Sequence, residues 1–416
     1  MKWTNALSTL PSLEAALDEV IAQTTAALPA PPDLAILFIS TAYTSEFTRV
    51  LPLLQEKLAV KHLIGCGGNG IIGQPLGQTP AEIEAKPAIA LTLAHLPEVR
   101  IQTFHIEGRH LPDSDSPPQD WVDLLGIDPQ DDPAFMLLAD ASTAKVRELL
   151  QGMDFAYPNA EKIGGLTSGS SLFGGSGLFL EDCLLHEGTI GVALSGNIVL
   201  DTIVAQGCRP IGPPFRVTEA ERHIALQVEL LGRSLGAALE AGAEILTPLE
   251  ALEDLLEDLE ETDRALAQQA LSVGIASNEF KENLEPGDYL IRDLIGVDPK
   301  VGAIAIGDRI RAGQRIQFHL RDARASAEDI ETLVMRYQSR IAGADNAPQG
   351  AVVFNCLGRG AGFYGTPNHD IQTICQYIPQ IPITGFFCHG EIGPIGGSTY
   401  LHGYTASIGI FRCKEV

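Results

Sequence analysis

The sequence predicts an α/β protein with α+β character, in which mixed β-sheets pack together in two related halves with helices outside. "LAILFIS" is a continuous apolar run, typical of a buried strand, and helical patterns lie on both sides of it. "GTIGVALSGNIVLDTIVAQGC" has two β-rich runs around "SGN", which predicts an antiparallel hairpin. Apolar strands also run into glycine turns three times, in "LIGCGGNG", "KIGGLTSG" and "ITGFFCHG".

The first third of the chain alternates helices and strands. Residues 12–28 show helical spacing of apolar positions and end at "PAPP", which stops a helix. "LAILFIS" then predicts a strand, "SEFTRVLPLLQEKL" a helix and "HLIGCGGNGIIG" a strand with a glycine turn. Two strands follow between 87 and 107, then a strand in "DDPAFMLLAD" and a helix in "ASTAKVRELLQGM". This rhythm predicts sheets covered by helices.

The centre of the chain changes character. We expect helices from Thr218 to about Gln269, and "LEALEDLLEDLEETD" places leucines on one face and acids on the other. The helix over 249–264 is expected to lie on a sheet with a solvated acidic face; a helix that docks a partner is the alternative. Strands resume in "DYLIRDLIGV", "GAIAIGD" and "QRIQFHLRD", and a helix follows in "SAEDIETLVMRYQSRIA". "GAVVFNC", "PITGFFCHG" and "TYLHGYTASIGIF" are the last expected strands.

This pattern suggests four segments. They are an N-terminal helix and linker over 1–32, an N-terminal domain over 33–217, a helical connector over 218–270 and a C-terminal domain over 271–416.

Composition excludes several function classes. A chain of 416 residues with 45% hydrophobic residues is longer than one core usually grows. Its formal charge of −25 repels phosphate backbones and anionic lipid surfaces, so we expect neither nucleic-acid binding nor membrane insertion. The N-terminus carries acids where a signal peptide needs an apolar segment, and the seven cysteines are scattered without a CxxC pair. We therefore expect a cytoplasmic protein with reduced thiols.

"ITGFFCHGEIGPIGG" raises the question of chemistry because Cys388, His389 and Glu391 lie almost side by side in it. Cys388 and His389 are consecutive, so on a strand they point to opposite faces and cannot both bind one ion in regular geometry. Further ligands would have to come from His402, His369 or Cys356. The sequence therefore predicts no metal, and no cofactor is expected.

A hydrolase-like enzyme with a cysteine nucleophile is the alternative function. Cys66 and Cys388 both precede glycine-rich turns of the kind that supply oxyanion-stabilising N–H groups, and His402 is a base that could reach either. No papain-like or caspase-like signature surrounds them. Neither the dinucleotide fingerprint nor the phosphate-binding loop motif is present.

A small-molecule pocket at the glycine turns is the favoured interpretation. Arg359 would pair with a carboxylate of the ligand, or form a salt bridge with an acid of the protein itself. Glu391 would contact the ligand, or accept hydrogen bonds from the backbone of the "HGEIG" turn. The expected ligand-binding residues are Glu391, His389, Gly390, Arg359, Asn355, Gly65, Cys66, Gly67 and Tyr364, with Phe363 as further apolar wall.

With these motifs in view, the chain resembles the FIST proteins, named for F-box and intracellular signal transduction. "LAILFIST" and "LIGCGGNGIIG" look like the opening of the FIST N-terminal domain. "DYLIRDLIGVDP", "GQRIQFHLRDA", "VFNCLGRG", "ITGFFCHGEIGP" and "YLHGYTASIGIF" look like the C-terminal domain. The first motif keeps Gly65 and Cys66 but lacks the glutamate of the family pattern, whereas "GEIGP" is intact and gives weight to Glu391.

The resemblance implies a stand-alone sensory module that binds a small ligand, such as an amino acid or related metabolite. No kinase, methyl-accepting or F-box segment accompanies it in this sequence. Signal output is therefore expected to pass through a partner protein or an oligomer.

Overall fold

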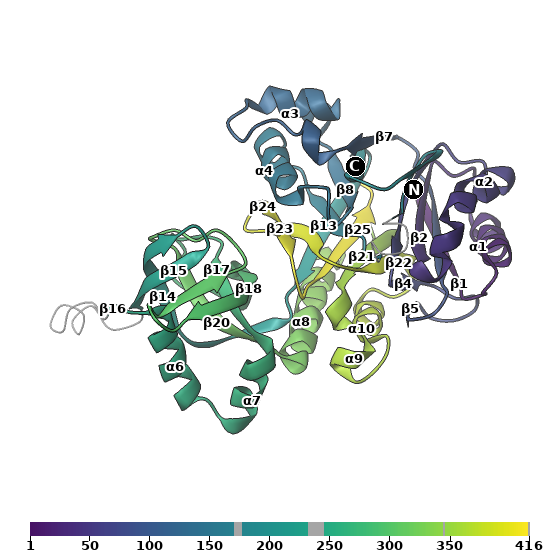
Figure 1. The fold of residues 1–416 in the computed structure, drawn as a ribbon. Coiled ribbons are helices and arrows are strands. Elements are labelled where there is room, and N and C mark those ends of the chain that lie inside the picture. Colours follow the sequence, from purple (N-terminus) through teal and green to yellow (C-terminus); the bar gives the residue numbers. More distant parts are fainter. Residues whose placement is uncertain (170–176, 232–244, 344–345, 415–416) are drawn as a thin grey trace. The chain divides into compact units, whose positions relative to one another are not determined.

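The chain forms two compact units, unit 1 (Met1–Ala205 and Ile330–Val416) and unit 2 (Gln206–Asp329) (Figure 1). The computed structural model describes all residues except 170–176, 232–244, 344–345 and 415–416. Among the described residues, no helix is both long and apolar enough to span a bilayer.

Unit 1 is built from three repeats with the same order of elements: strand, helix, strand, helix and four strands. Repeat A contains β1 (Lys2–Ser8), α1 (Leu13–Ala27), β2 (Leu34–Ser40), η1 (Thr41–Glu46), α2 (Phe47–Lys57), β3 (His62–Gly68), β4 (Gly70–Gly73), β5 (Ala81–Glu84) and β6 (Ile89–His95). Repeat B contains β7 (Val99–Ile106), η2 (Gly108–His110), α3 (Pro118–Leu125), η3 (Pro129–Asp131), β8 (Ala134–Ala139), α4 (Val146–Ala156), β9 (Lys162–Leu166), β10 (Leu178–Leu180), β11 (Cys183–Leu185) and β12 (Thr189–Gly196). Repeat C contains β13 (Val199–Ala205), α8 (Ala323–Ile341), β21 (Gly350–Cys356), η6 (Leu357–Arg359), α9 (Ala361–Tyr364), α10 (His369–Tyr377), β22 (Ile383–Cys388), β23 (Glu391–Ile395), β24 (Ser398–His402) and β25 (Ala406–Arg412).

Each repeat exchanges a hairpin with another repeat. Within a repeat, the second and third strands pair in parallel, as β2 with β3, β8 with β9 and β21 with β22. The hairpin that follows leaves its own sheet: β4–β5 pairs with β22, β10–β11 with β3, and β23–β24 with β9. The result is three six-stranded mixed sheets connected in a cycle. The structure therefore shows threefold repetition where the sequence suggested two related halves.

A glycine marks the same position in each repeat. Gly65, Gly164 and Gly385 lie on the third strand, opposite Leu37, Leu137 and Val353 of the parallel neighbour. A Cβ at these glycines would lie 2.2, 1.9 and 1.9 Å from the carbonyl oxygen of the facing residue. No side chain fits at that distance. The three strand-to-glycine motifs noticed in the sequence are thus one motif, used three times for close backbone approach.

The sheets share an inner core and carry separate outer cores. Inner faces of all three sheets meet in one apolar cluster, in which the Phe38 ring lies 6.3 Å from Phe354 and 5.1 Å from Phe386. Outer faces are covered by the helices of their own repeat, such as α1 and α2 over the sheet of repeat A. β2 is buried along its whole length, which explains its continuous apolar sequence. The prediction of mixed sheets packed together with helices outside is confirmed.

Unit 2 contains a closed antiparallel barrel, whose strands lie in the chain between β13 and α8. Its strands are β14 (Cys208–Glu221), β15 (Ile224–Leu230), β16 (Ile245–Leu246), β17 (Leu271–Ala276), β18 (Tyr289–Asp298), β19 (Ala303–Ile306) and β20 (Arg315–Arg321), with helices α6 (Pro248–Asp258) and α7 (Glu261–Ala270) and the short turn η5 (Pro286–Asp288). β14 pairs with both β20 and β15, and this double pairing closes the barrel. The Gln206 backbone N–H donates to Asp329 Oδ2 at 2.7 Å, so the two ends of the insertion meet.

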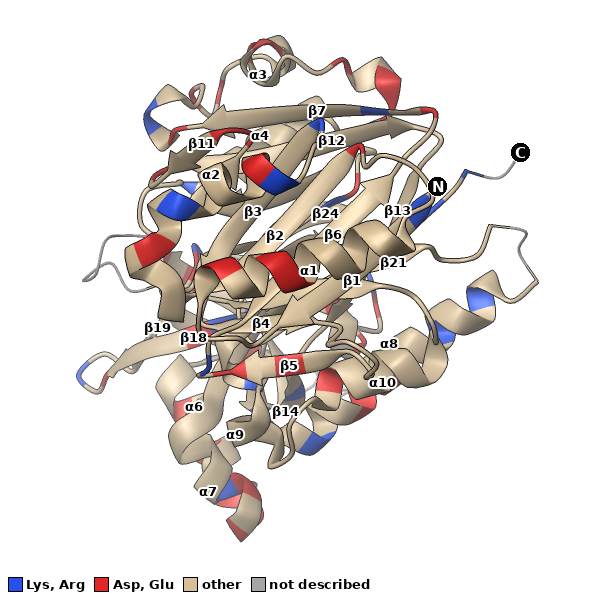
Figure 2. Ribbon diagram, turned by 90° about the vertical axis from the view of Figure 1, so that its right-hand side faces the viewer, with Lys and Arg blue, Asp and Glu red and all other residues tan. Residues whose placement is uncertain are grey.

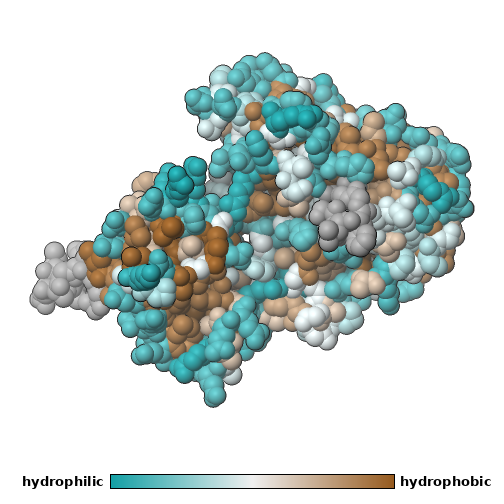
Figure 3. All heavy atoms as spheres, in the orientation of Figure 1, coloured by the Kyte–Doolittle hydropathy of each residue, from teal (hydrophilic) through white to brown (hydrophobic). Residues whose placement is uncertain are grey.

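Charge and apolar surface are unevenly distributed. Acidic residues recur along α1, α6 and α7 (Figure 2). The face of unit 2 seen in Figure 3 has a broad apolar area. Several large apolar side chains of unit 2 are exposed. They are Ile245, Phe280, Ile295, Val297 and Val301.

Two expectations about the middle of the chain were wrong. β12 and β13 do not form a hairpin around "SGN", because β12 pairs with β7 and β8 whereas β13 pairs with β25 of another sheet. Helices do not begin at Thr218: this region forms β14 and β15, while 232–244 lie outside the described residues. The amphipathic segment is helical as α6 and α7. The expected boundaries after 217 and 270 both fall inside unit 2.

Candidate functional site

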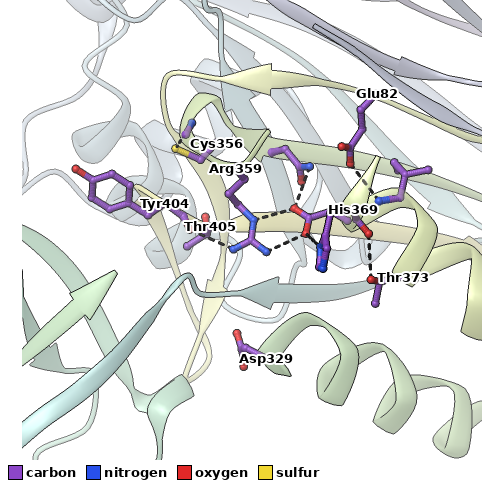
Figure 4. Close-up of polar contacts among 12 residues, drawn as sticks. Glu82, Asp329, Cys356, Arg359, His369, Thr373, Tyr404 and Thr405 are labelled. Carbon is purple, nitrogen blue, oxygen red and sulfur yellow. Dashed lines mark hydrogen bonds and ion pairs between the residues drawn. The ribbon is translucent and has the colours of Figure 1, made fainter. Parts of the chain in front are cut away.

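The parallel strands β21 and β22 end side by side in repeat C and carry the candidate site (Figure 4). Their last residues, Cys356 and Cys388, are paired in register. Beyond β21 the chain turns through η6 and α9, and beyond β22 it turns into β23, which begins with Glu391. These turns bring an arginine, several carboxyl groups and a thiol together.

A buried ion pair lies at the centre. Arg359 donates from Nε to Asp370 Oδ2 at 2.9 Å and from Nη2 to Oδ1 at 3.2 Å, and neither side chain has exposed surface. Asn355 Nδ2 also donates to Asp370 Oδ2, and Arg359 Nη1 donates to the Tyr404 carbonyl oxygen at 3.4 Å. Burial by itself would raise the pKa of Asp370, but the Arg359 charge and hydrogen bonds from His369, Arg359 and Tyr364 lower it. Of the two roles considered for Arg359, the structure contains the internal salt bridge.

Glu391 is a second buried acid, with an unusual environment. Its Oε2 accepts hydrogen bonds from the Thr405 N–H at 3.2 Å and from Thr405 Oγ1 at 2.9 Å. Its Oε1 is buried without a nitrogen or oxygen partner among the described residues. Burial raises the pKa of Glu391 to about 8, although Thr405, Arg359 and the Cys356 thiol each lower it. The backbone groups that it binds belong to the turn before β25, not to the "HGEIG" turn.

Glu391 differs in chemistry from the residues at the equivalent positions of the other two repeats. It pairs with Gly165 of β9, the residue after the close-approach glycine. The equivalent register positions are Leu178, which pairs with Cys66, and Ile71, which pairs with Phe386. Both are fully buried apolar residues of the inner core. Repeat C therefore has a carboxyl group where the same fold otherwise uses a hydrocarbon side chain.

The exchanged hairpin of repeat A adds two acids that sequence reasoning missed. Glu82 Oε1 accepts from the Ile371 N–H at the start of α10, and Glu84 Oε1 accepts from the Ala361 N–H at the start of α9. Both carboxyl groups thus accept from backbone N–H groups in the first turn of a helix, which have no partner within the helix. Burial and then the Asp370 charge raise the pKa of Glu82 to about 8. No local signal links Glu82 to α10, because 289 positions separate it from Ile371.

Cys356 was also missed, except as a distant candidate metal ligand. It is partly exposed, its sulfur accepts from the Gly358 N–H at 3.5 Å, and its thiol is close enough to Glu391 to lower the pKa of that carboxyl group. A signal was present in the sequence, because "FNC" and "FFC" end two apolar strands in the same way. Among the described residues, no group of three or more His, Cys, Asp or Glu side chains could hold a metal ion.

The other predicted residues fall into two groups. Asn355 and Tyr364 join the cluster: the Tyr364 ring stacks on His369 at 3.9 Å, and the Arg359 guanidinium lies 5.7 Å from its centroid. His389 is exposed, and the backbone of His389 and Gly390 is hydrogen-bonded to Leu166 of repeat B.

Gly65, Cys66 and Gly67 lie buried on β3, and Cys66 is part of the inner core. The Cys66 side chain has no exposed surface, so a ligand cannot contact it without rearrangement of the core.

The two thiols considered as nucleophiles are poorly suited to that role. Burial raises the pKa of Cys66 and of Cys388 well above the ordinary value, and the Cys388 thiol donates to the Phe386 carbonyl oxygen at 3.5 Å. His402 is buried, with Nε2 at 2.9 Å from the Gly393 carbonyl oxygen. A nucleophilic cysteine needs a stabilised thiolate, and these environments favour the neutral thiol.

A surface hollow of about 360 Å³ lies away from this cluster, between α3, α4 and the preceding loop. Trp121, Lys145, Gln151 and Phe155 are among its lining residues, and none of the residues predicted to bind a ligand lines it. The hollow and the buried acids are therefore separate features of unit 1.

Several known proteins are similar to this chain. An uncharacterized protein of Mycobacterium tuberculosis is 33% identical over 406 residues, covering 97% of this chain and 98% of that protein. An F-box/LRR-repeat protein of Arabidopsis thaliana is 25% identical over 287 residues, covering 63% of this chain and 52% of that protein. A solved cyanuric acid hydrolase of A. caulinodans aligns over 100% of this chain and 99% of its own with 9% identity and a TM-score of 0.31.

Two family models match in sequence order. The FIST N domain matches residues 33–229 and the FIST C domain matches residues 248–394. The gap between them lies inside unit 2, so the family division and the compact units differ. FIST domains are generally ligand-binding signal-transduction domains. With both domains matched and a relative 33% identical along nearly its whole length, the chain belongs to the FIST family.

Proposed function

We propose that this protein is a sensory module that binds a small ligand carrying a protonated amine, such as an amino acid or related metabolite, beside Glu391. The observation that carries the proposal is the buried carboxyl group of Glu391 at a position where the sister repeats have Leu178 and Ile71. Burial of an acid among apolar groups is costly, and such perturbed acids are concentrated at functional sites.

The surroundings of Glu391 Oε1 indicate the chemistry of the ligand. Glu391 Oε1 is buried and accepts from no nitrogen or oxygen donor of the described chain. Arg359 already donates two hydrogen bonds to the Asp370 carboxylate, so it is not available to bind a carboxylate of the ligand. An ammonium group would both donate to Oε1 and stabilise the ionised carboxylate.

The turn over Glu391 offers a route for the signal. Tyr404 is partly exposed and has a left-handed backbone with φ 64°. Its carbonyl oxygen accepts a hydrogen bond from Arg359, and the N–H of the next residue donates to Glu391. A ligand that reaches Glu391 must displace this turn. Its changed conformation would then be read by a partner protein or by a second copy of the chain.

We place this module in the cytoplasm. None of the seven cysteines, all of which lie in the described part of the chain, forms a disulfide, which fits a reducing compartment. The net charge of −25 argues against nucleic-acid partners.

Isothermal titration calorimetry with a panel of amino acids, amines and carboxylic acids tests the ligand. Amine-bearing compounds should bind, and binding at pH 7 should release about one proton because the ligand ionises Glu391. Glu391→Gln should abolish both binding and proton release, whereas Glu56→Gln, on the exposed side of α2, should change neither. Binding of carboxylic acids alone, or amine binding unaffected by Glu391→Gln, would refute the proposal.

A further inference from the structure

The ends of β21 and β22 hold two cysteines in register. Cys356 and Cys388 pair directly, so their side chains leave the sheet on the same face. Adjacent strands lie about 4.8 Å apart, and disulfides form when Cα atoms are about 4.4–6.8 Å apart. The pair therefore meets the backbone requirement for a disulfide.

The two thiols differ in access. Cys388 is fully buried in the inner core, whereas Cys356 is partly exposed. Each sulfur makes a weak hydrogen bond to the backbone: Cys356 accepts from the Gly358 N–H, and Cys388 donates to the Phe386 carbonyl oxygen, both at 3.5 Å. Rotation of the two sulfurs toward each other breaks these weak bonds and the hydrogen bond between the Cys356 thiol and Glu391.

The accessible thiol has a hydrogen-bond donor beside its sulfur. The Gly358 N–H donates to Cys356 Sγ and stabilises the anion that forms when the thiol loses its proton. The Glu391 carboxyl group near this thiol is mostly protonated at neutral pH, because burial raises its pKa to about 8, so it places little negative charge next to the sulfur. An attacking thiol and a resolving thiol thus occupy neighbouring positions.

We propose that Cys356 is an oxidant-sensing thiol that reacts with hydrogen peroxide and then forms a disulfide with Cys388. In the first step the partly exposed Cys356 thiol loses its proton to solvent and its sulfur attacks one peroxide oxygen; the O–O bond breaks, and the hydroxide that leaves takes up one proton from solvent to become water. In the second step the Cys388 sulfur attacks the sulfenic acid, the S–O bond breaks and the hydroxide leaves with the Cys388 proton as water. Two thiols are oxidised to one disulfide, and peroxide is reduced to two molecules of water.

This inference does not depend on the ligand proposal, because it concerns the chain without any ligand. Cys183 provides an internal control: it is exposed, and hydrogen bonding to Asp182 raises its pKa. Low thiolate character should make Cys183 slow to react despite its exposure.

Peptide mapping after peroxide treatment and alkylation of the remaining thiols tests the proposal on the full chain. Trypsin cuts after Arg359 and so separates Cys356 from Cys388, and chymotrypsin cuts after Tyr377 to separate Cys388 from Cys375. A linked Cys356–Cys388 peptide that dithiothreitol releases is the expected product. The thiol count should fall from seven to five per chain.

Two variants distinguish the steps. Cys356→Ser should leave Cys388 reduced after peroxide, and Cys388→Ala should stop Cys356 at the sulfenic acid, which dimedone traps. Because Cys388 is buried, tryptophan fluorescence should first establish that this variant is folded; the wild-type peptide map needs no variant. Persistent alkylation of Cys356 while Cys183 oxidises, or a disulfide between Cys388 and Cys66, would overturn the inference.

Discussion

Replacement of Glu391 by glutamine should change how the stability of unit 1 depends on pH. The pKa of this carboxyl group is about 8 in the folded chain, against an ordinary value of 4.5. Between these two values the folded state keeps a proton that the unfolded state has lost, so the free energy of unfolding falls as pH rises. A difference of about 3.5 pKa units, at about 1.4 kcal/mol each, corresponds to at most about 5 kcal/mol.

Glutamine has nearly the same shape as glutamic acid, but its side chain does not titrate. Its side-chain oxygen can keep both hydrogen bonds from Thr405, and the amide nitrogen takes the place of Oε1. The charged or titratable groups that act on this site are Arg359, Cys356 and Cys388, and none of them is changed. Glu82 has a similarly raised pKa and contributes a parallel pH dependence that the variant retains. The difference between the two proteins therefore isolates Glu391.

Urea denaturation between pH 5 and pH 9, followed by tryptophan fluorescence, measures this difference. The two tryptophans of the chain, Trp3 and Trp121, are both buried in unit 1, so the signal reports the unit that contains Glu391. Glu391→Gln should gain stability relative to wild type by about 3–5 kcal/mol between pH 5 and pH 9. Glu56→Gln should follow the wild type. Parallel curves for Glu391→Gln and wild type would refute the assignment of a buried, protonated acid.

Three further predictions concern the framework around the site. Arg359→Ala should destabilise unit 1 by about 3–5 kcal/mol in the same urea assay, because it leaves Asp370 buried and unpaired, and adding Asp370→Asn should restore part of the loss. Gly385→Ala should cost about 3 kcal/mol or more, since the new Cβ would lie 1.9 Å from a carbonyl oxygen; Gly362→Ala, with nothing within 4 Å, is the matched control and should be nearly neutral. Residues 206–329 expressed alone should give a cooperative unfolding transition by circular dichroism, because the barrel is closed and its ends meet; a non-cooperative melt would contradict this.

Local hydrophobic patterns in the sequence predicted individual helices and strands well. The apolar run "LAILFIS" is β2 residue for residue, and the helical spacing over 12–28 is α1 within a residue at each end. Strand partners were not predictable in the same way. "SGN" does turn the chain, with Gly196 at φ 92°, but the two flanking strands enter different sheets. A turn signal carries no information about which long-range partner a strand will find.

The same difference applies to the candidate site: residues in local motifs were predictable, and residues brought in by long-range contacts were not. Glu391, Arg359 and Asn355 belong to glycine-turn motifs of repeat C and were found from sequence. Asp370 has no motif of its own, and Glu82 arrives on a hairpin exchanged from repeat A. Their roles depend on tertiary contacts that no sequence window contains.

The threefold repetition makes the two buried acids Glu82 and Glu391 informative about function. Glu82 lies opposite Ile72 in its hairpin, and the equivalent positions in the other two hairpins are Leu184 and Leu401. Glu391 likewise stands where the sister repeats have aliphatic side chains. The same backbone therefore packs with hydrocarbon side chains at both positions, so the fold itself does not require either acid. Since an apolar residue there would avoid the cost of burying a carboxyl group, the presence of both acids supports the proposal of a binding site at the ends of β21 and β22.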